Sequence, residues 1–182
     1  MFQKTLYITK AKHNLYKVEW SEDKNFGLYG AYKGRLVWSA LTNLNLKMSD
    51  VQIQDWTTID YFKPSEFRCK CCGKLYIDFD FVLLLNLIRN RAGIPFIITS
   101  GYRCPAHNKA VGGKTNSAHL YGKAADILVQ SSKDRYLILE AALYYGVKRI
   151  GIAPQTSRRA AFIHIDTMSD DAHPSPTIWL YT

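Results

Sequence analysis

Ten residues near the middle of the chain restrict its fold more than any others. The segment SAHLYGKAAD, residues 117–126, sets a histidine and an aspartate seven positions apart, with a glycine between them. A helix would place positions seven apart on one face, but Gly122 in mid-segment weakens a helix. The overlapping segment KAADILVQ, residues 123–130, alternates so that Ala124 and Asp126 share one side of a strand. We therefore expect a half-buried strand that carries Asp126.

A carboxylate among apolar neighbours is costly unless it is paired, hydrogen-bonded or bound to a metal. His119 lies in the loop before this strand, so the two side chains could be ligands of one cation. The alternative is a solvated turn histidine and an aspartate in a salt bridge. A third ligand would decide between these interpretations.

The segment FIHID, residues 162–166, supplies that third ligand. Alternation turns Ile163 and Ile165 toward the core and places His164 and Asp166 on the opposite face. Two histidines and one carboxylate form an open tetrahedral zinc site with a fourth position for water. Because zinc lowers the pKa of bound water to ~7 and polarises a carbonyl, this ligand set predicts hydrolysis of a peptide bond. We expect one such zinc ion per chain.

The remaining pattern predicts a small α+β domain with helices packed on a largely antiparallel sheet. Acidic starts, apolar faces and closing glycines predict helices over residues 78–93 and 132–146, and Pro105 opens a shorter one over 105–111. The remaining strands are expected over residues 94–100, 148–154 and 161–168.

Residues 1–58 are rich in aromatic and β-branched residues and in glycine turns. They predict short strands over 13–20, 26–34 and 35–41 in a β-rich extension whose role is open. The catalytic domain is then expected over residues 59–182.

The formal net charge of +9 favours polyanions such as nucleic acid, acidic lipid and the anionic cell wall. No nucleic-acid-binding motif organises the basic residues, so we expect no nucleic-acid partner. No apolar run approaches the ~18 residues of a membrane span. The first 20 residues have no long apolar stretch that ends in small residues, so we expect synthesis in the cytoplasm without a secretory signal. The oligomeric state is open.

Four cysteines occur in the segments CKCCGK and GYRCPAH: Cys69, Cys71, Cys72 and Cys104. The first group could suggest a structural zinc knuckle, but it lacks the usual pair of C-x-x-C arms. One disulfide to Cys104 is an alternative, and free thiols are expected of a protein made in the cytoplasm.

Three segments together resemble the peptidase M15 family of zinc-dependent D-Ala-D-Ala carboxypeptidases and peptidoglycan peptidases. They are SGYRCPAHN, VGGKTNSAHLYGKAADI and FIHID, in this order, and FKPSEFRCKCCG resembles the start of that family's catalytic domain. The resemblance covers about residues 60–182 and leaves 1–58 outside. It implies the fold that these enzymes share with the hedgehog signalling domain.

The resemblance also implies roles for individual residues. The zinc ligands would be His119, Asp126 and His164. Arg103 would bind substrate, because a guanidinium can grip a carboxylate through two hydrogen bonds or stabilise an oxyanion; a structural salt bridge is the alternative. Further candidates for contact with substrate are Ser117, Tyr102 and His107, and Ser117 could instead brace the ligand loop.

One position departs from the family pattern. Several members carry an acidic or histidine general base three residues before the last zinc histidine, where this chain has Ala161. Asp166 is the substitute that we consider, either as the base or as a group that orients a zinc ligand.

These features predict a zinc hydrolase that cuts a peptide bond in the stem or cross-link of bacterial peptidoglycan. A phage or prophage enzyme released through a holin, or carried by a virion, would reach that substrate without a signal peptide. The alternative is a non-catalytic zinc domain for wall binding or virion assembly, as the hedgehog relatives suggest.

Overall fold

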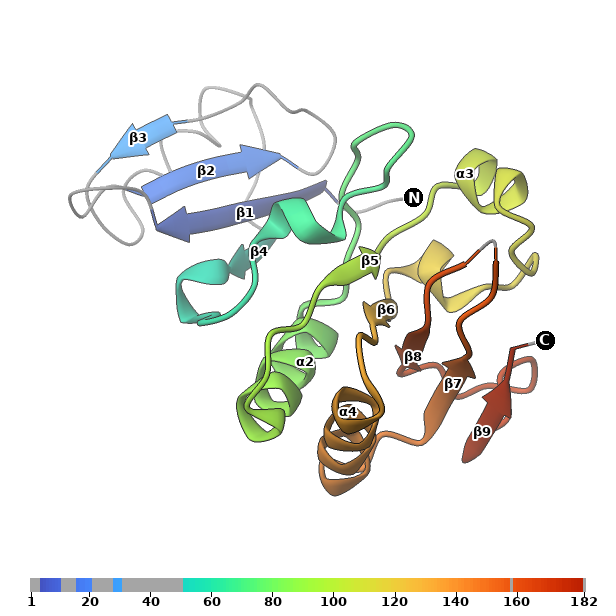
Figure 1. The fold of residues 1–182 in the computed structure, drawn as a ribbon. Helices are drawn as coiled ribbons and strands as arrows, with labels where there is room; N and C mark the ends of the chain where they lie inside the picture. The colour runs from blue at the N-terminus through green and yellow to red at the C-terminus, as the bar shows by residue number, and fades with distance from the viewer. Residues whose placement is uncertain (1–3, 11–15, 21–27, 31–50, 158, 182) are drawn as a thin grey trace.

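The described part of the chain contains two sheets. The computed structural model describes residues 4–10, 16–20, 28–30, 51–157 and 159–181, with side chains from residue 54 onward. The strands of the first sheet are β1 (Lys4–Lys10), β2 (Tyr16–Trp20), β3 (Leu28–Gly30) and β4 (Val51–Asp55), in the order β3-β2-β1-β4 (Figure 1). Its pairs are antiparallel except β1 with β4.

Two described strands fall within ranges predicted for the N-terminal extension, and the β-rich extension as a whole stays a prediction. β2 lies within the predicted strand 13–20, and β3 lies within 26–34. The third predicted strand, 35–41, lies outside the described residues.

The predicted domain boundary after residue 58 stays a prediction. Short 3-10 turns follow β4: η2 (Trp56–Thr58) and η3 (Pro64–Phe67). Trp56 is buried in the core of the second sheet's domain, and the Gln54 side-chain amide donates to the carbonyl oxygen of Ile77 at 2.7 Å. The end of the first sheet is therefore joined to the second by packing as well as by the chain.

The second sheet has the order β5-β6-β8-β7-β9. Its strands are β5 (Ile98–Ser100), β6 (Ala124–Leu128), β7 (Arg149–Ala153), β8 (Phe162–Asp166) and β9 (Thr177–Leu180). All its pairs are antiparallel except β7 with β9, which is parallel. The predicted α+β class is confirmed, with a mixed sheet because of the added edge strand β9.

The helices start at or next to their predicted first residues, and the last one ends at Tyr144, shortly before the predicted Gly146. In α2 (Phe79–Ala92), the Asp78 side chain accepts the first capping bond and Gly93 closes the helix in the left-handed region. In α4 (Ser132–Tyr144), the Ser131 side chain accepts from Asp134, and Pro105 opens α3 (Pro105–Ala110). None of the helices in these described ranges is long and apolar enough to cross a membrane.

Alternation along the strands divides the second sheet into an apolar and a polar face. Ile127 on β6 and Ile163 on β8 are register partners and are fully buried, together with Ile165. They share one core with residues of α2 and α4, which lie side by side in Figure 1. The opposite face carries Asp126, paired in register with His164, so strand pairing itself brings these two polar residues together.

Candidate metal centre

Three side chains meet on the polar face of the second sheet. Asp126 Oδ1 lies 3.2 Å from His119 Nε2 and 2.8 Å from His164 Nδ1. The two imidazole nitrogens are 3.2 Å apart. All three side chains are buried. The structure therefore brings together the three residues that the sequence predicted as ligands.

Within the predicted loop before β6, a short turn delivers His119. The residue lies in the 3-10 turn η4 (Ala118–Tyr121), which ends at Gly122 with φ of +66°. A side chain at position 122 would also come within 2.4 Å of the carbonyl oxygen of Tyr76. Glycine thus allows the chain to reverse between the histidine and β6, so that both ligands face one point.

Hydrogen bonds behind the imidazoles orient both rings. His119 Nδ1 lies 2.7 Å from the carbonyl oxygen of Gly101, and His164 Nε2 lies 3.0 Å from Asp166 Oδ2. Both partners are acceptors, so these outer nitrogens carry hydrogens. The inner nitrogens then face Asp126, and two nitrogens and one carboxylate oxygen converge within hydrogen-bond distance. This is the donor set of a zinc site with an open position.

The pKa of one histidine of the centre is raised, and the pKa values of the other histidine and of the aspartate are lowered. Burial opposes protonation of His164, but the carboxylates of Asp126 and Asp166 outweigh it and raise the pKa of His164 to about 9. Burial also lowers the pKa of His119. For Asp126, burial is outweighed by the two histidines, and the pKa of its carboxyl lies far below the usual range. In the metal-free chain the centre therefore holds a carboxylate and one protonated imidazole.

Asp166 is held behind His164, on the side away from the converging donor atoms. Its Oδ1 accepts from Arg149 Nε at 2.8 Å and from the Met168 backbone at 3.0 Å, while Oδ2 faces His164. The residue is 2% exposed. Asp166 must lie near His164 to act either as the general base or as a group that orients this zinc ligand. This geometry favours the orienting role over that of general base.

Arg103 lies beside the centre and contacts one of its candidate ligands. Its Nη2 is 2.5 Å from Asp126 Oδ2, and its Nε donates to Ser100 Oγ at 2.7 Å. The side chain also lines two cavities. Arg103 therefore makes the structural salt bridge and also faces open space in which a substrate could bind.

The larger cavity, of about 640 Å³, opens directly onto the candidate centre. Ser117, whose contact with substrate stays a prediction, lines it together with His119 and His164. Tyr102 is not among the lining residues, because its ring packs edge-on against Tyr76 with centroids 5.8 Å apart. The structure thus gives no support to a substrate contact by Tyr102. A smaller cavity of about 310 Å³ is lined by Asp126, Arg103 and His107.

Sequence reasoning missed an aromatic wall of the larger cavity. The Trp179 and Tyr181 rings lie 5.4 and 6.4 Å from the His164 ring. Gly151, the register partner of both His164 and Trp179, leaves room for them, since a Cβ there would lie 2.6 Å from Tyr181. The alternation of aromatic residues in TIWLYT was the available signal.

His173 is a further residue of this cavity. Its Nδ1 lies 2.7 Å from Asp170 Oδ1, and its Nε2 lies 2.6 Å from the carbonyl oxygen of Asn116. The ring therefore links two loops on the cavity wall.

We predict that zinc binding at the centre strengthens with rising pH. His164 carries a proton below about pH 9 in the metal-free chain, and zinc must displace it. The apparent affinity should rise about tenfold per pH unit up to about pH 8 and level off only above about pH 9, where His164 has lost its proton. Competition with a chromophoric chelator measures this affinity. His119→Ala removes a candidate ligand and should lose this zinc ion. His173→Ala is the control and should keep it. Equal zinc content in wild type and His119→Ala would contradict a site at His119.

We also predict that Asp166→Asn weakens zinc binding by ~10 to 100-fold while the chain stays folded. An amide can place its NH₂ group against His164 Nε2, which would move the imidazole proton to the nitrogen that faces the centre. At saturating zinc, turnover should largely return. A loss of 10² to 10⁴-fold that saturating zinc leaves uncorrected would instead identify a general base. Asp171→Asn, at an exposed position of the following loop, is the control.

The comparison with known protein families agrees with this geometry. The family model described as Peptidase M15 matches residues 60–166, which include all three candidate ligands and more than half of the chain. No curated protein gives a significant match. On the strength of the family match, the chain belongs to the peptidase M15 family and is a metallopeptidase.

Proposed function

We propose that the protein is a zinc peptidase that cuts a peptide bond in the stem or cross-link of bacterial peptidoglycan. One observation carries the proposal: His119, Asp126 and His164 converge, and the two histidines line a cavity large enough for several residues of a peptide. A zinc ion held there supplies Lewis-acid polarisation of the scissile carbonyl and lowers the pKa of water.

In this proposal each side chain of the centre has a separate task. His119, Asp126 and His164 hold the metal. Asp166 keeps the hydrogen on His164 Nε2, so that Nδ1 stays directed at the metal. The Gly101 carbonyl oxygen keeps the hydrogen on His119 Nδ1, so that Nε2 stays directed at the metal. The open side of the centre is left to the substrate.

Arg103 is suited to bind an anionic part of the substrate. Asp126 and Ser100 hold its guanidinium in place, and its side chain is 16% exposed. A fixed guanidinium beside the reacting carbonyl can donate to a developing oxyanion or to a substrate carboxylate. Its ion pair with a metal ligand preserves that position.

The smaller cavity supports an acidic peptide as the substrate. Lys70, Arg103 and Arg159 contribute positive charge to its lining. The Nε and Nη2 atoms of Arg159 are buried without a hydrogen-bond partner. A carboxylate in this cavity would lie beside three cationic side chains, and peptidoglycan stem peptides carry free carboxylates. The overall charge of +9 would further favour adhesion to an anionic wall.

A phage or prophage setting belongs to the same proposal. It has the enzyme made in the cytoplasm and brought to the wall by holin release or in a virion. The resemblance to peptidoglycan peptidases supports this setting. Microscopy of host cells before and after lysis, with the enzyme labelled, tests it.

We predict that the purified protein releases new chain ends from purified cell walls, and that a chelator stops this. Mass spectrometry of the muropeptides identifies the bond, because a carboxypeptidase removes terminal D-Ala whereas an endopeptidase opens stems or cross-links. Zinc restores the activity of the chelated wild type. Zinc-loaded protein that binds walls and leaves every muropeptide intact would favour the non-catalytic alternative, which Ala161 makes worth testing.

We predict that Arg103→Ala lowers kcat/KM by on the order of 10²-fold or more, because an oxyanion or carboxylate contact is lost. Arg103→Lys should restore only part of this, since an ammonium lacks the two-point geometry. The matched control is Arg91→Ala, because Arg91 pairs with Glu140 away from the site. Zinc content and thermal unfolding are measured alongside. If Arg103→Ala kept full activity per folded, zinc-loaded molecule, the role of Arg103 would be structural and not catalytic.

A further inference from the structure

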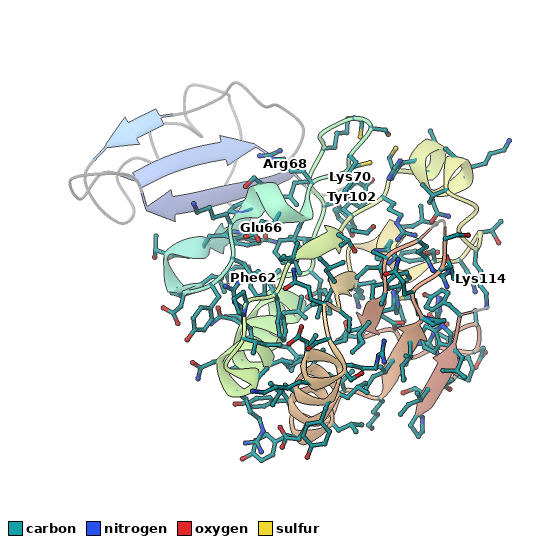
Figure 2. All side chains as sticks on the ribbon, viewed as in Figure 1. Phe62, Glu66, Arg68, Lys70, Tyr102 and Lys114 are labelled. Atoms are coloured by element: carbon teal, nitrogen blue, oxygen red, sulfur yellow. The ribbon has the colours of Figure 1, made fainter. Side chains whose placement is uncertain are left out.

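All four cysteines of the chain come together at a second place. The sulfur atoms of Cys69, Cys71, Cys72 and Cys104 all lie within 4.8 Å of one another. The Cys69 and Cys71 sulfurs are 3.6 Å apart, and those of Cys71 and Cys104 are 3.3 Å apart. None of the four is in a disulfide. Figure 2 shows sulfur atoms near the labelled Lys70, where this loop lies beside the segment that leads into α3.

Backbone hydrogen bonds shape the loop that carries three of these cysteines. Cys69 donates its N–H to the carbonyl oxygen of Lys74 at 2.8 Å and accepts from Gly73 at its own carbonyl, also at 2.8 Å. The loop is thus a tight knuckle over residues 69–74. Tyr102 donates to the Phe67 carbonyl oxygen at 2.9 Å, which holds the segment before Cys104 against the start of the knuckle.

Backbone N–H groups also point at the sulfurs. Cys104 N–H lies 3.4 Å from Cys69 Sγ, and His107 N–H lies 3.4 Å from Cys104 Sγ. Burial opposes ionisation of Cys69, but the N–H groups of Cys104, Cys71 and Cys72 outweigh it and lower its pKa to about 6. The pKa of Cys71 is raised, first by its contact with Cys104. The sulfurs thus lie where backbone N–H groups would stabilise negative charge on them.

We propose that Cys69, Cys71, Cys72 and Cys104 bind a second zinc ion with a structural role. Sulfurs placed tetrahedrally about 2.3 Å from zinc form edges of about 3.8 Å, close to the two separations seen here. Four protein ligands leave no open position, as in structural zinc sites. Zinc binding displaces the thiol protons, and no oxidation or reduction is involved. A bound zinc ion would offset the electrostatic repulsion between neighbouring thiolates.

The position of this site links it to the metal centre of the peptidase. Cys104 directly follows Arg103, which contacts Asp126, and Lys70 on the knuckle lines the same cavity as Arg103. A zinc ion joining the knuckle to Cys104 would fix both cationic side chains. The second ion thus acts as a positioning element and takes no part in the reaction.

The test uses His119→Ala, which lacks a ligand of the first centre. This variant should keep about one zinc ion per chain, and adding Cys71→Ser and Cys104→Ser should remove it. Lys70→Ala, in the same knuckle, is the control and should keep the ion. Cobalt exchanged into His119→Ala should give the charge-transfer absorption of cobalt bound to thiolates, which requires no cysteine variant.

Two results would overturn the proposal. One is a folded His119→Ala protein that holds no zinc and shows no cobalt–thiolate absorption. The other is a disulfide among these cysteines in peptides from the non-reduced native protein. Neither result depends on catalysis, so the proposed peptidase function stands or falls separately.

Discussion

The buried charge of Asp126 is the constraint on which the site depends. A carboxylate at this depth is costly unless it is fully paired. Oδ1 meets the imidazoles of His119 and His164, and Oδ2 meets the guanidinium of Arg103. The same carboxylate therefore positions two candidate ligands and the candidate substrate-binding residue. A chain that lacked any of these partners would leave a buried charge partly unpaired.

The second sheet allows so much polarity on one face because the other face is wholly apolar. Ala125, Ile127, Ile163 and Ile165 are buried with no exposed surface and face the core shared with α2 and α4. The helices stabilise the sheet from that side alone. The strands can therefore carry Asp126 and His164 without depending on them for packing.

Local patterns were sufficient to predict much of this arrangement. Alternation along residues 162–166 is a property of a single strand, so the shared face of His164 and Asp166 followed from sequence, whereas the approach of Asp126 to His164 depends on the pairing of β6 with β8. Caps at Asp78 and Gly93 likewise set the ends of α2. The placement of His119 needed only one more element, the reversal at Gly122.

Contacts between distant segments were not predicted from the sequence, because no short segment encodes them. β9 joins the sheet by parallel pairing with β7, a strand well before it in the chain, and this brings Trp179 to His164. The partner of Asp166 on the neighbouring strand, Arg149, depends on the same register across strands. The gathering of Cys104 with the knuckle depends on contact between segments about 30 residues apart, which cysteine spacing alone did not show.

The link through His173 has a consequence for how such a cavity can change during evolution. Asn116 receives a bond from His173 at its carbonyl and donates its side-chain amide to the Ala172 carbonyl at 3.4 Å. Loops usually vary more in sequence and length than the elements that they connect. Here two loops more than 50 residues apart are joined by two hydrogen bonds. A change in the length of either loop reshapes both sides of the cavity, so new substrate preferences should arise through paired substitutions.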